Sequence, residues 1–548
     1  MLAVNGAFFQ GKMLTYAVVA ITILAGAYLL LSLFRRAFQR RPHIRDSGSP
    51  GHVGIVKTAA LDMQRQYIVV RRDGIDRLVM ISGPSEISGP SELVIEPDLS
   101  GTSGDSYGID ESLTTVKTPI TARFGRIASY IGPASRIFVG PGLVPLAVLS
   151  GISGAGVGLV CGLFRLALVT VDRFRVSLPV LWQGHPLLGY GLMIAGAGAA
   201  AGFSAWLVRR FSEHAIGSGI PQVEAVINEE LPPAPFILLP VKFIGGLLAI
   251  GAGLALGREG PSVQMGATVA HLLGKTFGRS SADCRCLLAA GAGAGLAAAF
   301  NAPLAGAAFV LEELTRKFDT REAIAALGAS GSAIVVARLF TGPEPDFVVT
   351  TILYPVVGDN LWCVGLGIVA GLLGAVYSRV LFGALALTDR LARWPVEFRA
   401  AMIGAVVGAF AWLTPGLVGG GDMLTQRTLD GTEALALLPF IYLLRLFLGA
   451  ASYAAGTPGG LFAPLLVLGA QMGFIFGGLV NPGMTDPTSH AVAFAVVGMA
   501  ALFTAVVRAP LTGMILVTEM TENSQLLLPM LAACFSAMAV ATILREPP

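Results

Sequence analysis

The chain contains 548 residues, of which 54% are hydrophobic and only 13% are charged. An ordinary soluble domain carries about 25% charged residues, so this composition excludes a soluble globular protein of this length. The formal net charge is +3, without a basic block suited to a phosphate backbone, which excludes a nucleic-acid-binding protein. Glycine is nearly twice as frequent as its usual share of about 7%, which favours helix backbones that approach closely in lipid. The composition therefore predicts an all-α polytopic membrane protein.

Residues 1–41 are predicted to form an N-terminal transmembrane anchor with a basic flank. Leu14 to Phe34 is an apolar run long enough to cross about 30 Å of hydrocarbon. Four arginines follow this run by residue 41, and the positive-inside rule then places residue 35 onward in the cytoplasm. A cleaved signal peptide would need a basic front end and a small-residue cleavage site, so we predict a retained anchor.

Residues 42–120 are predicted to be a small β-containing cytosolic segment followed by a linker. Alternating β-branched residues flank Asp73-Gly74, which predicts a hairpin, and Ser91 to Pro97 is a candidate third strand. One span, a basic flank and this strand pattern resemble FliO, a component of the bacterial flagellar export apparatus. The resemblance implies flagellar export components as candidate partners of residues 1–100. An anchored spacer without activity of its own is the alternative interpretation.

The remaining residues, 121–548, are predicted to form one membrane domain built from an internal repeat. Pro303 lies nine residues before Glu312, and Pro510 lies nine residues before Glu519, with an apolar run between them in both copies. Further matches keep the same order, which indicates two homologous halves. The halves span about 142–320 and 360–545. Such repeats are typical of secondary transporters, whose substrate binds where the halves meet.

Three motifs combine glycine and proline where apolar segments are interrupted: GSGIP (217–221), GREGP (257–261) and GGLFAP (459–464). Proline suits the first turn of a helix, and glycine lets a backbone approach a ligand. A helix that begins inside the membrane leaves up to four N–H groups unpaired, and the positive end of its dipole attracts an anion. One such break is usually only a kink, whereas three breaks that converge would form an anion site.

These motifs, together with FNAPLAG…LEEL (300–314) and RAPLTG…TEM (508–520), resemble those of the CLC family of chloride channels and chloride/proton antiporters. The resemblance implies an inverted repeat of two helical halves with broken helices. It also implies a homodimer in the bacterial inner membrane that exchanges chloride for protons, with no cofactor and no metal. The chain has no catalytic constellation and no ATP-binding fingerprint, so we predict a gradient-driven transporter and not an enzyme.

The resemblance implies a chloride site centred on Ser218, whose hydroxyl donates to the central anion. The same resemblance implies further anion-binding positions at Gly219, Ile220, Arg258, Gly260, Leu461, Phe462 and Ala463. Serine at this place accompanies chloride transport in the family, whereas proline accompanies nitrate. A tyrosine that follows the last helix in the family has no counterpart within these 548 residues, so no residue is assigned to its role.

Glu259 is implied as the external gate, whose carboxylate occupies an anion site when ionised and leaves it when protonated. Physical reasoning leads to the same role, because a carboxylate at a helix N-terminus beside Arg258 competes with chloride for the same donors. Protonation removes the competitor and so links proton binding to anion movement. A simple ion pair between Arg258 and Glu259 is the alternative interpretation.

Glu313 is implied as the internal proton acceptor, a position that is not acidic in most channel members of the family. The repeat aligns Glu312 with Glu519 and leaves Glu313 as an extra carboxylate. Glu224 and Glu312 are implied as accessory residues of the proton pathway, although Glu312 could equally be a solvated or paired helix-end carboxylate. The alternatives in function are a passive chloride channel and, through the N-terminal segment, a flagellar export assembly factor. Fluoride exchange is disfavoured because GSGIP and GREGP are intact.

Overall fold

The computed structural model describes residues 142–349, 359–480 and 487–544, together with the backbone of four strands between residues 54 and 95. Residues Thr22–Pro119 form one compact unit and the rest of the chain forms another. The predicted anchor at Leu14 to Phe34 lies outside the described residues.

The smaller unit contains an antiparallel sheet with the strand order β1-β2-β3-β4. Its strands are β1 (Gly54–Asp62), β2 (Arg65–Arg72), β3 (Ile75–Ser82) and β4 (Val94–Ile95). Arg72 of β2 pairs with Ile75 of β3, so these strands flank the two residues at which the sequence predicts a hairpin turn. Strand β4 lies within the segment that the sequence marks as a third strand.

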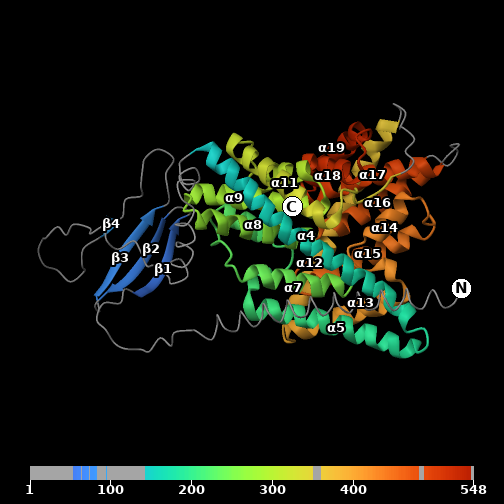
Figure 1. Ribbon diagram of the computed structural model, residues 1–548, viewed down its shortest axis with the longest axis horizontal. Coiled ribbons are helices and arrows are strands. Elements are labelled where there is room, and N and C mark those ends of the chain that lie inside the picture. The colour runs from blue at the N-terminus through green and yellow to red at the C-terminus, as the bar shows by residue number, and fades with distance from the viewer. Residues whose placement is uncertain are drawn as a thin grey trace, which may run out of the picture. The chain divides into compact units, whose positions relative to one another are not determined.

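The larger unit is helical (Figure 1), because a backbone in lipid must satisfy its hydrogen bonds within each segment. Its first half consists of α4 (Leu143–Leu181), α5 (Pro186–Phe211), the 3-10 turn η2 (Glu213–Ala215), α6 (Ile220–Ile227), α7 (Leu238–Gly251), α8 (Glu259–Thr276), α9 (Ser281–Phe300), α10 (Pro303–Phe309), the π turn η3 (Val310–Leu314) and α11 (Thr320–Thr341). Its second half consists of α12 (Asp359–Arg390), α13 (Val396–Leu413), the 3-10 turn η4 (Pro415–Leu417), α14 (Asp422–Leu429), α15 (Leu438–Tyr453), α16 (Phe462–Val480), α17 (Pro487–Val507), α18 (Pro510–Thr521) and α19 (Leu527–Ile543).

The two halves repeat one another element by element, as the sequence predicts. Helix α4 packs on α11 and α8 packs on α9 in the first half, and α12 packs on α19 and α16 on α17 in the second. The turns η2 and η4 stand at equivalent places, before the short helices α6 and α14. The element order extends the first half through α11, beyond the limit near residue 320 that the sequence motifs indicate, because α11 carries no motif of its own.

Glycine brings the central helices of both halves into backbone contact. In the first half, a Cβ atom at Gly266 of α8 would collide with the carbonyl oxygen of Gly291 in α9. In the second half, a Cβ atom at Gly469 of α16 would lie 2.6 Å from the carbonyl oxygen of Gly498 in α17. The high glycine content therefore serves close helix packing, which is the use that small residues have in membrane proteins.

Eight helices among the described residues are long and apolar enough to cross a membrane: α4, α5, α9, α11, α12, α13, α16 and α17. The three helices that start at the predicted motifs, α6, α8 and α16, begin within this bundle and not at a long polar loop. The protein is thus a polytopic helical membrane protein with broken helices.

Candidate functional site

The three glycine–proline motifs, which are far apart in the sequence, are joined by backbone hydrogen bonds. The N–H of Gly217 donates to the carbonyl of Thr457 at 3.2 Å, and the N–H of Gly459 donates back to Gly217 at 3.1 Å. Gly257 and Gly460 exchange both of their backbone hydrogen bonds, at 2.8 and 2.7 Å. The segments that precede α6, α8 and α16 therefore lie side by side, which is the convergence on which the predicted anion site depends.

Each of these helices begins directly beyond this backbone junction. Helix α6 starts at Ile220 after Gly219, whose φ of 82° lies in the left-handed region that favours glycine. Helix α8 starts at Glu259 and α16 starts at Phe462. The first N–H groups of a helix have no partner within it, and the helix dipole is positive at this end. Three helix N-termini, whose first N–H groups lack partners within their own helices, thus bring partial positive charge to one buried region.

Ser218 is buried in the loop between Gly217 and α6. Its hydroxyl oxygen accepts a hydrogen bond from the N–H of Ile220 at 3.3 Å, which leaves the hydroxyl hydrogen available for donation. The loop lies directly against the start of α8, since a Cβ atom at Gly260 would come within 2.7 Å of the Ser218 Cα. Glycine at position 260 is therefore required for the serine to approach the GREGP motif.

The carboxylate of Glu259 lies at the N-terminus of α16. The side chain is 1% exposed, and it interacts with the backbone N–H groups of Ala463 and of Glu259 itself. A Cβ atom at Gly257 would collide with the carboxylate, and one at Gly460 would lie 3.0 Å from its Oε2 atom. This Oε2 atom has no hydrogen-bond partner among the described residues. The Glu259 carboxylate thus occupies backbone N–H donors that could equally bind a small anion.

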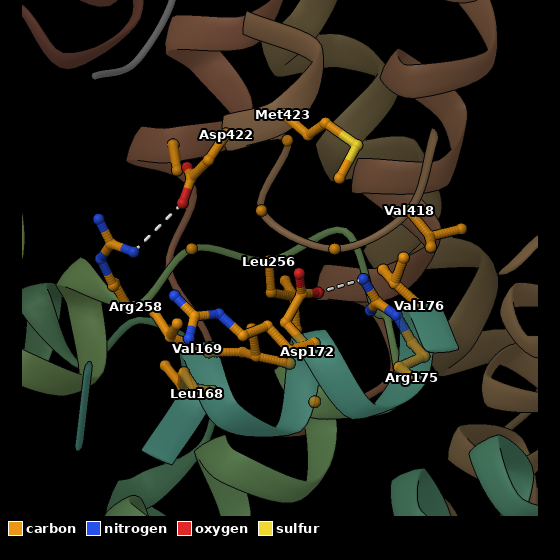
Figure 2. Close-up of a pocket in the computed structure, with 18 of the residues that line it drawn as sticks. Leu168, Val169, Asp172, Arg175, Val176, Leu256, Arg258, Val418, Asp422 and Met423 are labelled. Carbon is orange, nitrogen blue, oxygen red and sulfur yellow. Dashed lines mark hydrogen bonds and ion pairs between the residues drawn. The ribbon is translucent and has the colours of Figure 1, made fainter. Parts of the chain in front are cut away.

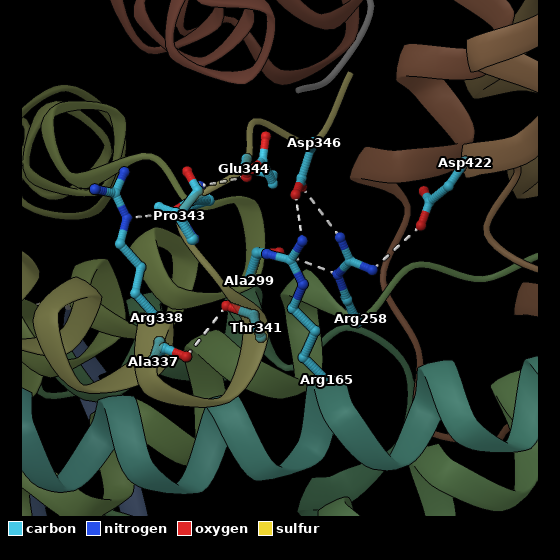
Figure 3. Close-up of polar contacts among 11 residues, drawn as sticks. Arg165, Arg258, Ala299, Ala337, Arg338, Thr341, Pro343, Glu344, Asp346 and Asp422 are labelled. Atoms are coloured by element: carbon cyan, nitrogen blue, oxygen red, sulfur yellow. Dashed lines mark hydrogen bonds and ion pairs between the residues drawn. The ribbon is translucent and has the colours of Figure 1, made fainter. Parts of the chain in front are cut away.

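The guanidinium of Arg258 contacts three protein groups (Figure 3). Its Nε donates to the carbonyl of Ala299 at 3.0 Å, and its two terminal nitrogens contact Asp346 at 3.1 Å and Asp422 at 3.2 Å. Asp346 also pairs with Arg165. Because Asp422 belongs to the second half, this network ties the start of α8 to both halves.

Lys242 supports the site and was not among the residues that the sequence motifs identify. It is fully buried, and its Nζ donates to the carbonyls of Ala215 at 3.1 Å and Gly217 at 2.8 Å. It thereby holds the loop that carries Ser218. The available sequence signal is that Lys242 is the only charged residue in α7, and an ionisable residue in an apolar membrane segment is a functional candidate by default.

Glu312 and Glu519, which the repeat aligns, cap each other's helices. The Glu312 carboxylate accepts hydrogen bonds from the Thr512 N–H at 2.6 Å and hydroxyl at 2.8 Å, at the start of α18. Glu519 accepts from the N–H groups of Leu304 at 3.0 Å and Ala305 at 2.8 Å, at the start of α10. Glu312 is therefore a paired helix-end carboxylate, the alternative that the sequence left open for it.

Glu313 is adjacent in the chain but lies in a different environment. The π turn Val310–Leu314, closed by a hydrogen bond from the Thr315 N–H to the Val310 carbonyl at 2.9 Å, carries both glutamates. Glu313 is half-buried and faces the charges of Arg316 and Glu224. Arg316, which the sequence motifs did not identify, forms an ion pair with Glu224 at 3.0 Å. Such π turns are frequent at functional sites.

Figure 2 shows residues that line a cavity of about 210 Å³, and Glu259 is also one of its lining residues. It is formed by α4, by the segment around Leu256 to Glu259, by Ala463 and by the loop of residues 415–423. We call it the Arg175 cavity, after the buried arginine of α4 that lines it. Glu259 at the start of α8 and Ala463 near the start of α16 both line the cavity.

Comparison with known proteins agrees with this geometry. The family described as "Voltage gated chloride channel" matches residues 197–542. Proteins described as "H(+)/Cl(-) exchange transporter ClcA" from Salmonella arizonae and Salmonella typhimurium are each 37% identical over 419 residues, which cover 74% of this chain and 87% of theirs.

Solved structures give the same relationship. A slow cyanobacterial Cl−/H+ antiporter is 31% identical with a TM-score of 0.68, over 73% of this chain and 96% of that one. A CLC-type fluoride/proton antiporter, at 22% identity and a TM-score of 0.61 over 73% of this chain and 95% of that one, shares the fold.

Proposed function

The chain belongs to the voltage-gated chloride channel family, the CLC family that its motifs resemble, and we propose that it exchanges chloride for protons across the bacterial inner membrane. One observation carries the proposal: a buried glutamate, Glu259, lies where three helix N-termini would hold an anion. Ionised, its carboxylate competes with chloride. Protonated, it loses that competition, so the same group couples the two substrates.

The proposed chloride pathway uses backbone donors and one hydroxyl. Ser218 donates to the central anion, and the backbone of Leu461, Phe462 and Ala463 completes the central and outer positions. Gly219, Ile220 and Gly260 bring their backbone close to the ion, and Arg258 lies beside the outer position. Support comes from the junction of the three motifs and from Lys242, whose Nζ donates to the Gly217 carbonyl and holds the loop that carries Ser218. Partial charges that are already oriented stabilise an anion without a full countercharge that would bind it too tightly.

The proposed proton pathway runs from internal water through Glu313 toward Glu259. Glu313 is half-buried beside the Arg316–Glu224 ion pair, which supports a role at a water-accessible end of the pathway. Partial burial disfavours the charged form of a carboxyl group and so makes proton uptake easier. Glu224 and Glu312 act as accessory residues in this proposal, Glu312 by holding the π turn against α18.

Reconstituted protein provides the direct test. In liposomes with a chloride gradient and no other driving force, chloride flow should drive protons against their own gradient. A passive channel, the second candidate, would move chloride without uphill proton movement. Proton flux that is absent while chloride flux is fast would therefore contradict exchange and favour the channel.

Ser218→Pro should shift the preference from chloride toward nitrate and weaken proton coupling. A hydrogen bond to a charged group contributes about 1.5–3 kcal/mol, so loss of the hydroxyl should weaken chloride binding by roughly tenfold or more. The flux ratio should change by at most this factor, because nitrate loses less of its binding than chloride. Paired chloride and nitrate efflux from the same vesicles measures this ratio. Ser218→Ala separates loss of the hydroxyl from the constraint of proline. An unchanged flux ratio in both variants would show that Ser218 is not an anion ligand.

We further propose that the chain is divided into an anchor (1–41), a FliO-like segment (42–120) and the transport domain (121–548), which forms a homodimer with one pathway per subunit. The compact unit Thr22–Pro119 supports only the boundary near residue 120, because its start at Thr22 falls inside the proposed anchor. Deletion of residues 1–120 should leave chloride flux and proton coupling intact, because the site residues all lie beyond residue 217. Loss of transport from a correctly folded deletion variant would instead assign the N-terminal part a role in transport. The proposed dimer is tested separately, by cross-linking of the protein in lipid.

A further inference from the structure

The second half contains a copy of the loop that carries Ser218. In the first half, Gly217 and Gly219 have φ values of 62° and 82°, and in the second half Gly419 and Gly421 have φ values of 74° and 98°. Each loop leads directly into a helix of eight residues, α6 or α14. The two loops thus share one backbone construction, and only the first has a role in the proposed pathway.

Both loops are also held by a buried cation in the same way. Lys242 binds the first loop through two carbonyls, as described above. Arg445, on the equivalent helix α15, is buried and donates through Nη1 to the carbonyls of Leu417 and Gly419 at 3.0 Å each. Its Nη2 donates to the carbonyl of Gly420 at 3.1 Å. The repeat has therefore preserved the support of the loop as well as its shape.

The second loop forms one wall of the Arg175 cavity, which Glu259 also lines. Asp422 and Met423, the first residues of α14, line this cavity, and Ala463 lines it near the start of α16. The unpaired N–H groups at the start of α14 and the dipole of that helix favour an anion here, as at the other helix starts.

Arg175 supplies a second and independent indication of a ligand. The residue is 5% exposed, and its Nη2 pairs with Asp172, while Nε and Nη1 have no hydrogen-bond partner among the described residues. Arg445, in contrast, places its terminal nitrogens on three carbonyls. Buried polar groups are almost always paired, and an unpaired charged donor at a cavity is explained when an anion completes its contacts.

Glycine at two positions makes room for this guanidinium. A Cβ atom at Gly253, where φ is 100°, would lie 2.8 Å from Nη1 of Arg175. A Cβ atom at Gly419 would lie 3.2 Å from Nη2. Gly419 also donates its N–H to the carbonyl of Gly253 at 2.7 Å, so the two glycines fix the backbone around the guanidinium.

The charges of the cavity depend on the state of Glu259. Its ionisable lining consists of three guanidinium groups and three carboxyl groups: Arg173, Arg175, Arg258, Asp172, Asp422 and Glu259. With every carboxyl ionised these charges cancel. Protonation of Glu259 removes one negative charge from this balance, which makes the cavity more favourable to an anion when the gate is released.

We propose that the Arg175 cavity is an outer anion subsite, in which chloride binds between the Arg175 guanidinium and the N-terminal backbone of α14 before it replaces the Glu259 carboxylate. The subsite rests on the proposed exchange function and adds a loading step to it. The subsite selects small inorganic anions by charge and size. Arg173 is exposed to solvent, so salt screens its charge and its attraction for an anion in the cavity is weak.

The first test replaces Arg175 together with its partner, as Asp172→Asn/Arg175→Gln, so that no carboxylate is left without its cation. The chloride concentration for half-maximal exchange should rise about tenfold, because a hydrogen bond to a charged group is lost, while the maximal rate and the proton-to-chloride ratio stay unchanged. The double variant leaves the net charge of the cavity unchanged, so its effect reports the lost guanidinium contact. Arg173→Gln, the control, removes one positive charge from the same cavity and should change this concentration by less than about twofold at physiological salt, because the exposed charge is screened.

The second test needs no change at Arg175. Crystals of the Glu259→Gln variant in bromide should show anomalous density within hydrogen-bonding distance of the Arg175 guanidinium. Absence of that density, or an unchanged half-maximal concentration in a folded double variant, would overturn the subsite. If either result occurs while wild-type protein still drives protons uphill, the exchange function stands and only the subsite fails. Failure of the wild-type protein to couple the two ions would contradict the proposed function itself.

Discussion

Glu259→Gln is expected to let chloride pass while proton movement falls to the background of protein-free vesicles. Glutamine has the shape of the protonated carboxyl group but can neither compete as an anion nor carry a proton. Chloride flux in the wild-type protein should rise as pH falls, because protonation removes the competing carboxylate, and this pH dependence should disappear in the variant. Chloride efflux measured across a pH series, with proton uptake recorded in the same vesicles, tests both expectations.

The surroundings of Glu259 make this variant well suited to the test. The carboxylate is enclosed by Gly257 and Gly460, and a side chain of equal size keeps that packing. Glu259→Asp is the matched control, since it retains a titratable group on a shorter side chain and should retain some pH dependence. Proton-coupled exchange that persists in Glu259→Gln would show that the gate is another residue.

Glu313→Gln is expected to abolish proton movement while chloride continues to flow. Glu313 is not part of the proposed anion site. It lies in the π turn, and its charged neighbours include Arg316 and Glu224. Removal of its carboxylate should therefore interrupt the internal proton route and leave the anion donors in place. Simultaneous recording of chloride efflux and proton uptake distinguishes this result from general inactivation.

The neighbouring Glu312 shows why both fluxes must be recorded. Its carboxylate caps α18, so its replacement would weaken the fold as well as any proton route. Glu313→Asp, which keeps an acidic group in the π turn, should restore part of the proton flux. Loss of both fluxes in Glu313→Gln would make Glu313 a structural residue. Retention of both would place the internal proton route elsewhere.

Much of the fold could be predicted from the sequence, because the relevant patterns are local. Long apolar runs indicate membrane helices whichever neighbours these helices pack against. The equal spacing of Pro303 to Glu312 and of Pro510 to Glu519 indicates the repeat. The limit of the first half was harder to predict, since α11 (Thr320–Thr341) has only the general character of an apolar helix.

The family and the three glycine–proline motifs were likewise available from the sequence. Each motif combines residue types with a direct backbone consequence, so each predicts a helix start without knowledge of its neighbours. The roles of Glu259 and Glu313 followed from the family resemblance, and for Glu259 also from its position at a helix N-terminus beside Arg258. Both roles remain predictions.

Only the tertiary structure decided which groups meet. It set Gly217 beside Gly459, surrounded Arg258 with Asp346 and Asp422, and separated the capping role of Glu312 from the environment of Glu313. The physical reason is that a polar group buried in a membrane protein must find its partner in space, and that partner can lie anywhere in the chain. Composition and spacing can indicate that a charged side chain will be buried, but only the folded structure determines which group pairs with it.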